Sequence, residues 1–132
     1  MQHEIRNRPA FANVCLHLQQ GDRIIAEADA MSSMSSTIAI RTRFSGGVVR
    51  GLLRRGFGGE SMFVNEFSTE SEGELVLTQP FPGDIECLEL DGTTLFLQPG
   101  AFIACEPRVR LGLGWAGVRM AIAREGLFRL RV

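Results

Sequence analysis

Short alternating runs of apolar and polar residues cover most of this chain. "NVCLHLQ" places Val14, Leu16 and Leu18 on one side of an extended strand and more polar neighbours on the other. Similar runs follow at "STIAIRT", "SMFVNEF", "ELVLTQ", "DIECLEL", "TTLFLQ" and "RVRLGL", separated by Gly, Pro or Asp. Because successive strand residues face opposite sides, the pattern predicts an all-β fold.

Two stretches depart from this alternation, "GGVVRGLLRRGF" from Gly46 and "GWAGVRMAIARE" from Gly114. Their apolar residues have helical spacing, although the glycines weaken a helix. The first stretch is either a crossover packed on the sheets or a short amphipathic segment that lies on an anionic membrane surface. Its candidate surface-binding residues are Arg50, Arg54 and Arg55.

The strand pattern repeats with a period of about 70 residues, which indicates duplicated structural units. "CLHLQQGDRIIAEADAM" aligns with "CLELDGTTLFLQPGAF", so that Cys15 matches Cys87 and Leu16 matches Leu88. "GESMFV" aligns with "REGLFRL", with Phe63 on Phe128. We therefore predict one all-β domain over residues 1–132 with two related units, 13–84 and 85–132. The second unit is incomplete, because it has no counterpart of "GELVLTQPFPGDIE".

Composition indicates a globular protein. The 132 residues are 45% hydrophobic and 22% charged, with a net charge of -1, so nucleic acid is not the expected partner. The three cysteines lack metal-ligand spacing and lie in apolar runs, which predicts buried, reduced thiols. No long apolar span or signal-peptide core is present, and we expect a cytoplasmic protein.

Two glycine-rich stretches resemble nucleotide-binding motifs only superficially. In "GFGGE", Glu60 follows the last glycine where a phosphate-binding loop needs Lys and Ser or Thr, and a carboxylate repels an anion. "GLGWAG" matches the spacing of a dinucleotide-binding turn but lies in an all-β context without the required helix. We interpret the first set of glycines as turn residues.

Metal and catalytic chemistry find little support in the sequence. The two histidines are His3, in an N-terminal arm expected to be flexible, and His17, expected to face solvent. Two histidines and dispersed cysteines do not suggest a metal site, so we predict no metal and no cofactor. The acidic residues near turns are interpreted as solvated edges: Glu60, Glu66, Asp84, Glu86 and Glu125.

The chain resembles the altered-inheritance-of-mitochondria (mitochondrial biogenesis) family, related in fold to the tryptophan RNA-binding attenuation protein. The resemblance rests on "AEADAM", "RRGFGGESMFVNEF", "PFPGDIECLEL", "LFLQPGAFIA" and "EGLF", in family order. It implies a β-sandwich of the double-stranded β-helix type, repeated within the chain, without established enzymatic activity. The family-signature residues are Gly58, Gly59, Glu60, Phe63, Asn65, Pro82, Gly83 and Asp84.

These observations predict a non-catalytic scaffold or binding protein that forms homo-oligomers. The second unit lacks strands that would cover its edge, and exposed edges and apolar side chains promote association. Arg129 and Arg131 on the terminal strand would then pair with an acidic edge near Glu70, Glu72 and Glu74. The alternatives are a module that binds RNA or a membrane surface, with a peripheral membrane or protein partner, and a cupin-like metal-dependent enzyme.

Overall fold

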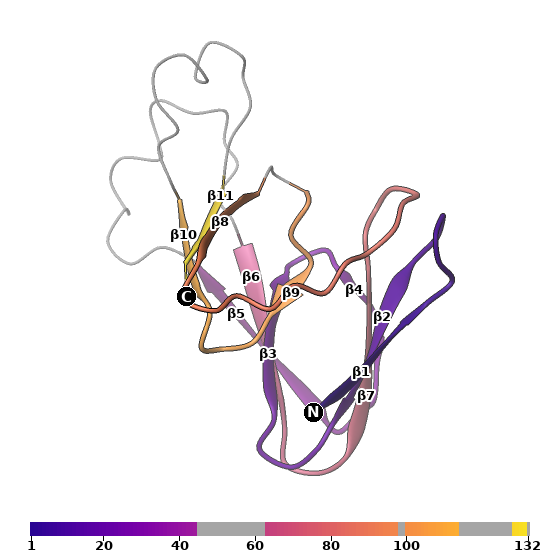
Figure 1. Ribbon diagram of the computed structural model, residues 1–132. Helices are drawn as coiled ribbons and strands as arrows, with labels where there is room; N and C mark the ends of the chain where they lie inside the picture. The colour runs from indigo at the N-terminus through magenta and orange to yellow at the C-terminus, as the bar shows by residue number, and fades with distance from the viewer. Residues whose placement is uncertain (45–62, 98–99, 114–127, 132) are drawn as a thin grey trace, which may run out of the picture.

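The computed structural model describes residues 1–44, 63–97, 100–113 and 128–131, which form strands and no helix (Figure 1). The strands are β1 (Gln2–Arg6), β2 (Asn13–Leu18), β3 (Arg23–Glu27), β4 (Met31–Met34), β5 (Ile38–Phe44), β6 (Phe63–Thr69), β7 (Gly73–Thr78), β8 (Thr94–Leu97), β9 (Ala104–Cys105), β10 (Arg110–Leu113) and β11 (Phe128–Arg131). The all-β prediction is confirmed. Both stretches with helical spacing lie outside the described residues. Within the described part of the chain, no helix is long and apolar enough to cross a membrane.

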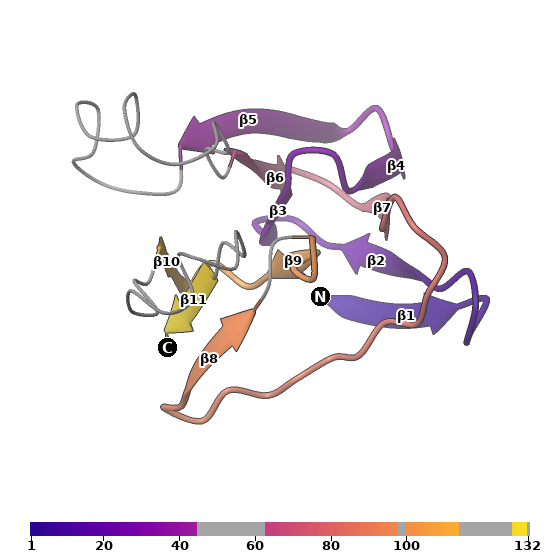
Figure 2. The same cartoon turned by 90° about the horizontal axis from the view of Figure 1, so that it is seen from above.

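The strands form three antiparallel sheets. Two have four strands, in the orders β1-β2-β7-β4 and β5-β6-β3-β9, and the third has the order β10-β11-β8. Figure 1 shows the first sheet on the right and the second on the left, connected below by turns. Seen from above, the third sheet lies to one side, beyond β9 (Figure 2). The first two sheets form a β-sandwich.

The main core fills the space between the two four-stranded sheets. Alternation on β2 and β7 turns Leu16, Leu18, Leu75 and Leu77 inward, as the apolar pattern predicts. The second sheet contributes Phe67, whose side chain is fully buried. The remaining buried members of this core are Ile24, Ala26, Ala30 and Ile38.

A second, smaller core covers the opposite face of the β5-β6-β3-β9 sheet. Ile24 and Ile25 are neighbours on β3, so their side chains face opposite sides, and Ile25 belongs to this second cluster. Val64 and Phe102 are its buried members. Partly buried Leu97 and Leu111 pack on it from β8 and β10. The middle sheet therefore contributes apolar side chains to a core on each of its faces and joins the sandwich to the C-terminal strands.

Three turns that carry the chain between the sheets are joined at one end of the sandwich. Gly21 has φ of +85°, a left-handed conformation that favours glycine, and its N–H donates to the Thr69 carbonyl at 3.0 Å. The buried Thr69 hydroxyl lies 3.1 Å from the Thr37 carbonyl oxygen and 2.9 Å from the Ser71 carbonyl oxygen. These contacts give the buried Thr69 hydroxyl hydrogen-bond partners and tie the three turns together.

Three expectations need correction. The N-terminal arm is strand β1, in which His3 pairs with Leu16, because β2 offers a free edge there. "DIECLEL" forms no strand, because residues 84–90 join none of the three sheets in the described part of the chain. Cys87 within it is consequently exposed, whereas Cys15 is buried and Cys105 is partly buried. All three cysteines are free.

Candidate functional site

The structure places the sequence-predicted site residues in separate environments. Gly58, Gly59, Glu60, Arg50, Arg54 and Arg55 lie outside the described residues. Phe63 begins β6, where its backbone pairs with Phe44 at the end of β5. Asn65 and the Pro82–Asp84 segment are described in full and contact different partners. The described signature residues therefore do not converge on one pocket.

Asn65 has a structural role within the sandwich. Its Nδ2 donates to the Ala28 carbonyl at 3.1 Å, and its Oδ1 accepts from Thr42 Oγ1 at 2.8 Å. These two bonds tie the turn after β3 to strands β5 and β6. Both ends of the amide are used, so Asn65 is committed to structure rather than to a ligand.

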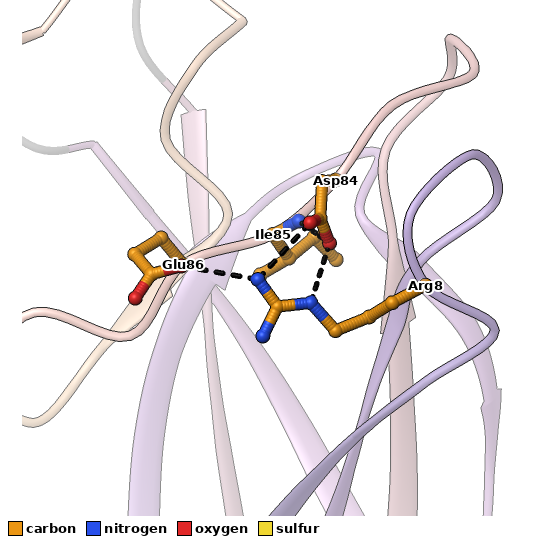
Figure 3. A network of polar contacts seen from close by, with 4 residues as sticks. All are labelled: Arg8, Asp84, Ile85 and Glu86. Carbon is orange, nitrogen blue, oxygen red and sulfur yellow. Dashed lines mark hydrogen bonds and ion pairs between the residues drawn. The ribbon is translucent and has the colours of Figure 1, made fainter.

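The Pro82–Asp84 segment anchors the loop between β1 and β2 (Figure 3). Arg8 Nε donates to Asp84 Oδ1 at 2.8 Å, and Arg8 Nη2 donates to Asp84 Oδ2 at 3.0 Å. Arg8 Nη2 also lies 3.1 Å from Glu86 Oε2. Beside this ion pair, the Ala12 N–H donates to the Gly83 carbonyl, and the Gly83 N–H donates to the Ala10 carbonyl. A bidentate guanidinium–carboxylate pair thus fixes two loops that are distant in sequence.

The Arg8–Asp84 pair shifts both groups toward their charged forms. The Arg8 guanidinium holds the pKa of Asp84 below its ordinary value and has its own pKa raised. For an acid with a lowered pKa, the stabilising contribution is present above the ordinary pKa. It is lost as the pH falls through the lowered pKa.

We expect Arg8→Ala to loosen this junction without unfolding the sandwich. The exchange rates of the Ala12 and Gly83 amide hydrogens should rise a few-fold at neutral pH, because the ion pair holds the two loops together. In acid, where Asp84 becomes protonated, the exchange rates of the wild type and the variant should become equal. Hydrogen exchange followed by NMR measures this. Arg6→Ala, which removes another exposed arginine of the same segment, is the control and should leave both rates unchanged.

The anchored loops present two aromatic side chains to solvent. Phe11 is 70% exposed and Phe81 is 77% exposed. Phe11 forms a backbone bridge to Gly83, close in sequence to Phe81. Both phenylalanines therefore lie on the loops that the Arg8–Asp84 pair joins, away from the two hydrophobic cores.

Glu66, like Asp84 and Glu86, was interpreted as a solvated edge and instead takes part in ion pairs. The Glu66 side chain is only 12% exposed and lies between two arginines, 3.0 Å from Arg43 and 3.8 Å from Arg23. These residues lie on adjacent strands, which antiparallel pairing brings together. Glu66 therefore belongs to a cross-strand charge network on the outer face of its sheet.

A cluster of potential metal ligands lies on the outer face of the β1-β2-β7-β4 sheet. Cys15 and His17 are two residues apart on β2 and so share a face. The antiparallel register places Glu74 of β7 opposite His17. Cys15 Sγ lies 3.9 Å from His17 Nε2, and His17 Nδ1 lies 3.9 Å from Glu74 Oε2. Sequence reasoning missed this cluster, although the Cys-x-His spacing on a strand was a signal for it.

The cluster combines a buried sulfur with accessible ligands. Cys15 is fully buried, while the His17 and Glu74 side chains are about half exposed. Burial raises the pKa of the Cys15 thiol, and the Glu74 carboxylate adds to that shift. An open depression of about 360 Å³ adjoins His17 and is lined by Leu18, Gln19, Glu72 and Gly73.

Comparisons with known proteins identify a family, a relative and a solved structure of similar fold. The family model described as mitochondrial biogenesis AIM24 matches residues 3–132. An uncharacterized protein of Streptococcus pyogenes serotype M6 is 28% identical over 112 residues, which cover 80% of this chain and 45% of that protein. An X-ray crystal structure of a Streptococcus pyogenes protein has a TM-score of 0.71 and 22% sequence identity, over 98% of this chain and 58% of that one. This chain thus spans about half the length of these relatives.

Proposed function

The chain belongs to the mitochondrial biogenesis AIM24 family, and from that premise we propose that it is a non-catalytic scaffold or binding module that associates with a second copy. One observation carries the proposal. Leu88 is 57% exposed, whereas Leu16, its counterpart in the first unit, is 4% exposed. The same apolar position is thus covered in one unit and open in the other.

Strand pairing explains the difference between these leucines. Leu16 pairs with Leu75 of β7, and both side chains belong to the main core. Leu88 lies in residues 84–90, which form no strand. Phe96, on β8 at the edge of the third sheet, is half exposed. Exposed apolar side chains and an open sheet edge each favour association with another chain.

The proposal includes an internal repeat of the double-stranded β-helix type, with units 13–84 and 85–132. The third sheet has the order β10-β11-β8, which parallels β5-β6-β3 in the first unit. Phe67 pairs with Ile24 and Ile40 in one sheet. In the other sheet, Leu130 pairs with Leu95 and Leu111. These two ladders support the repeat, because Leu130 has the same position in its sheet as Phe67 has in the other. The alignment of Phe63 with Phe128 would instead place Val132 there, so the ladders and the sequence alignment differ by two residues.

The route of association differs from the one expected from sequence. β11 carries Arg129 and Arg131, and it lies between β10 and β8 rather than at an edge. Pairing of this strand with the acidic edge of a neighbouring chain is therefore not part of the proposal. The proposed contact is formed by Leu88 and Phe96. Cytoplasmic residence belongs to the same proposal and is supported by the three free thiols.

We expect light scattering across a dilution series to show a concentration-dependent dimer or larger oligomer. Leu88→Glu should raise the dissociation constant at least about tenfold, because a carboxylate would be buried in the contact. The variant should remain folded, since Leu88 is exposed and outside a strand. Phe81→Glu, a matched change at an exposed apolar position on another loop, should leave association unchanged. A monodisperse monomer at high concentration would overturn the proposal.

A further inference from the structure

The outer face of strands β2 and β7 carries three potential metal ligands, Cys15, His17 and Glu74, within reach of one another. One ligand atom from each lies within 4.8 Å of the others. These side chains face away from the main core, because their neighbours Leu16 and Leu75 face into it. Their placement follows from the strand register and does not depend on a loop.

We propose that Cys15, His17 and Glu74 bind a divalent transition-metal ion of the zinc type. Thiolate, imidazole and carboxylate are the ligands that zinc uses in proteins, and the expected bond lengths place tetrahedral ligand atoms about 3.3–3.6 Å apart. The Cys15 Sγ to His17 Nε2 distance of 3.9 Å is already close to this value. Small rotations of the half-exposed His17 and Glu74 side chains complete the approach.

The surroundings suit a site with one open coordination position. Three protein ligands leave a fourth position for water, as in zinc sites that keep an open position. The half-exposed side chains of His17 and Glu74 leave this position on the solvent side of the sheet. A thiolate and a carboxylate together neutralise a divalent ion, and the nearby Glu4 and Arg6 form an ion pair with each other.

The same three side chains could also suggest covalent catalysis by a nucleophilic Cys–His–Glu triad. Such a triad needs a thiol that a substrate can reach and that ionises readily. Cys15 is fully buried, so a substrate cannot reach its thiol. A metal ion is small enough to lie between the buried sulfur and the two outer ligands, so the geometry favours metal binding over covalent catalysis. This inference is independent of the self-association proposed above.

The test is titration of the reduced, metal-free full chain with Co²⁺, followed by competition with Zn²⁺. We expect one equivalent of Co²⁺ to produce visible d–d bands and a thiolate-to-cobalt charge-transfer band, both removed by Zn²⁺. Cys15→Ser should abolish the charge-transfer band. His17→Gln and Glu74→Gln should each weaken affinity at least about 100-fold, because loss of outer-sphere partners already costs about 10- to 100-fold.

Two substitutions provide matched controls. Cys87→Ser removes an exposed thiol and His3→Gln removes an exposed histidine on β1, and both should leave affinity and spectrum unchanged. His17→Gln and Glu74→Gln change half-exposed side chains and keep the test valid if Cys15→Ser does not fold. Absence of stoichiometric binding, a charge-transfer band that survives Cys15→Ser, or equal losses in the control variants would overturn the proposal.

Discussion

Phe67→Ala lowers the free energy of unfolding by about 3–5 kcal/mol, the cost of removing a buried aromatic ring and leaving a cavity. Phe67 is fully buried on β6, with Ile24 and Ile40 opposite it on the neighbouring strands. Urea denaturation followed by circular dichroism measures the change. Ile40→Ala is the control on the same side of the same sheet. Ile40 is 40% exposed, so its truncation should cost much less.

If Phe67→Ala and Ile40→Ala lowered the free energy of unfolding equally, the hydrophobic core would not lie where we place it. The comparison is informative because Phe67 and Ile40 are direct partners across one ladder, and Phe67 is fully buried whereas Ile40 is 40% exposed. A lowered midpoint with an unchanged denaturant slope would indicate that the compactness of both states is preserved.

Leu75→Ala should lower the free energy of unfolding by about 2–5 kcal/mol. Leu75 is fully buried on β7, which lies between β2 and β4 in its sheet. Val76→Ala is the control, because Val76 is the next residue on the same strand and faces the opposite side. Its partly exposed side chain should cost less to truncate, as judged by the same denaturation experiment.

The Leu75 and Val76 pair also tests the orientation of the sheet. Val76 lies opposite Cys15 in the ladder, on the outer face that holds the proposed metal ligands. If Val76→Ala were the more costly change, the two faces would be exchanged and the proposed metal site would face the core. The stability measurement therefore bears on the metal proposal without using any metal.

Alternation was sufficient to predict four of the strands of the first unit. β2, β5, β6 and β7 each contain a run recognised in the sequence, because one face of each strand is buried and the other is polar. The same rule was wrong for "DIECLEL", whose local pattern is typical of a strand. A strand also needs a hydrogen-bonding partner, and the supply of partners is a property of the whole fold.

At the N-terminus, a strand forms that the sequence pattern did not predict. "QHEIR" has little apolar content and was expected to be a flexible arm, yet it forms β1 because the edge of β2 is available.

The metal-ligand cluster had a local and a non-local part. The Cys-x-His spacing on β2 could be read from the sequence, whereas Glu74 joins it only through the register of β2 with β7. The Arg8–Asp84 pair was likewise unpredictable, since its loops are distant in sequence.

The pairing of strands has a consequence for synthesis of the chain. β2 and β3 are made early, but β2 pairs with β7, and β3 pairs with β6 and with β9 near residue 104. A nascent chain on the ribosome therefore holds apolar strands whose partners have not been translated. Distant pairing slows folding, and unpaired strand edges invite aggregation. Chaperone protection should matter most between translation of β3 and translation of β7, and a stalled chain of that length should be the most aggregation-prone.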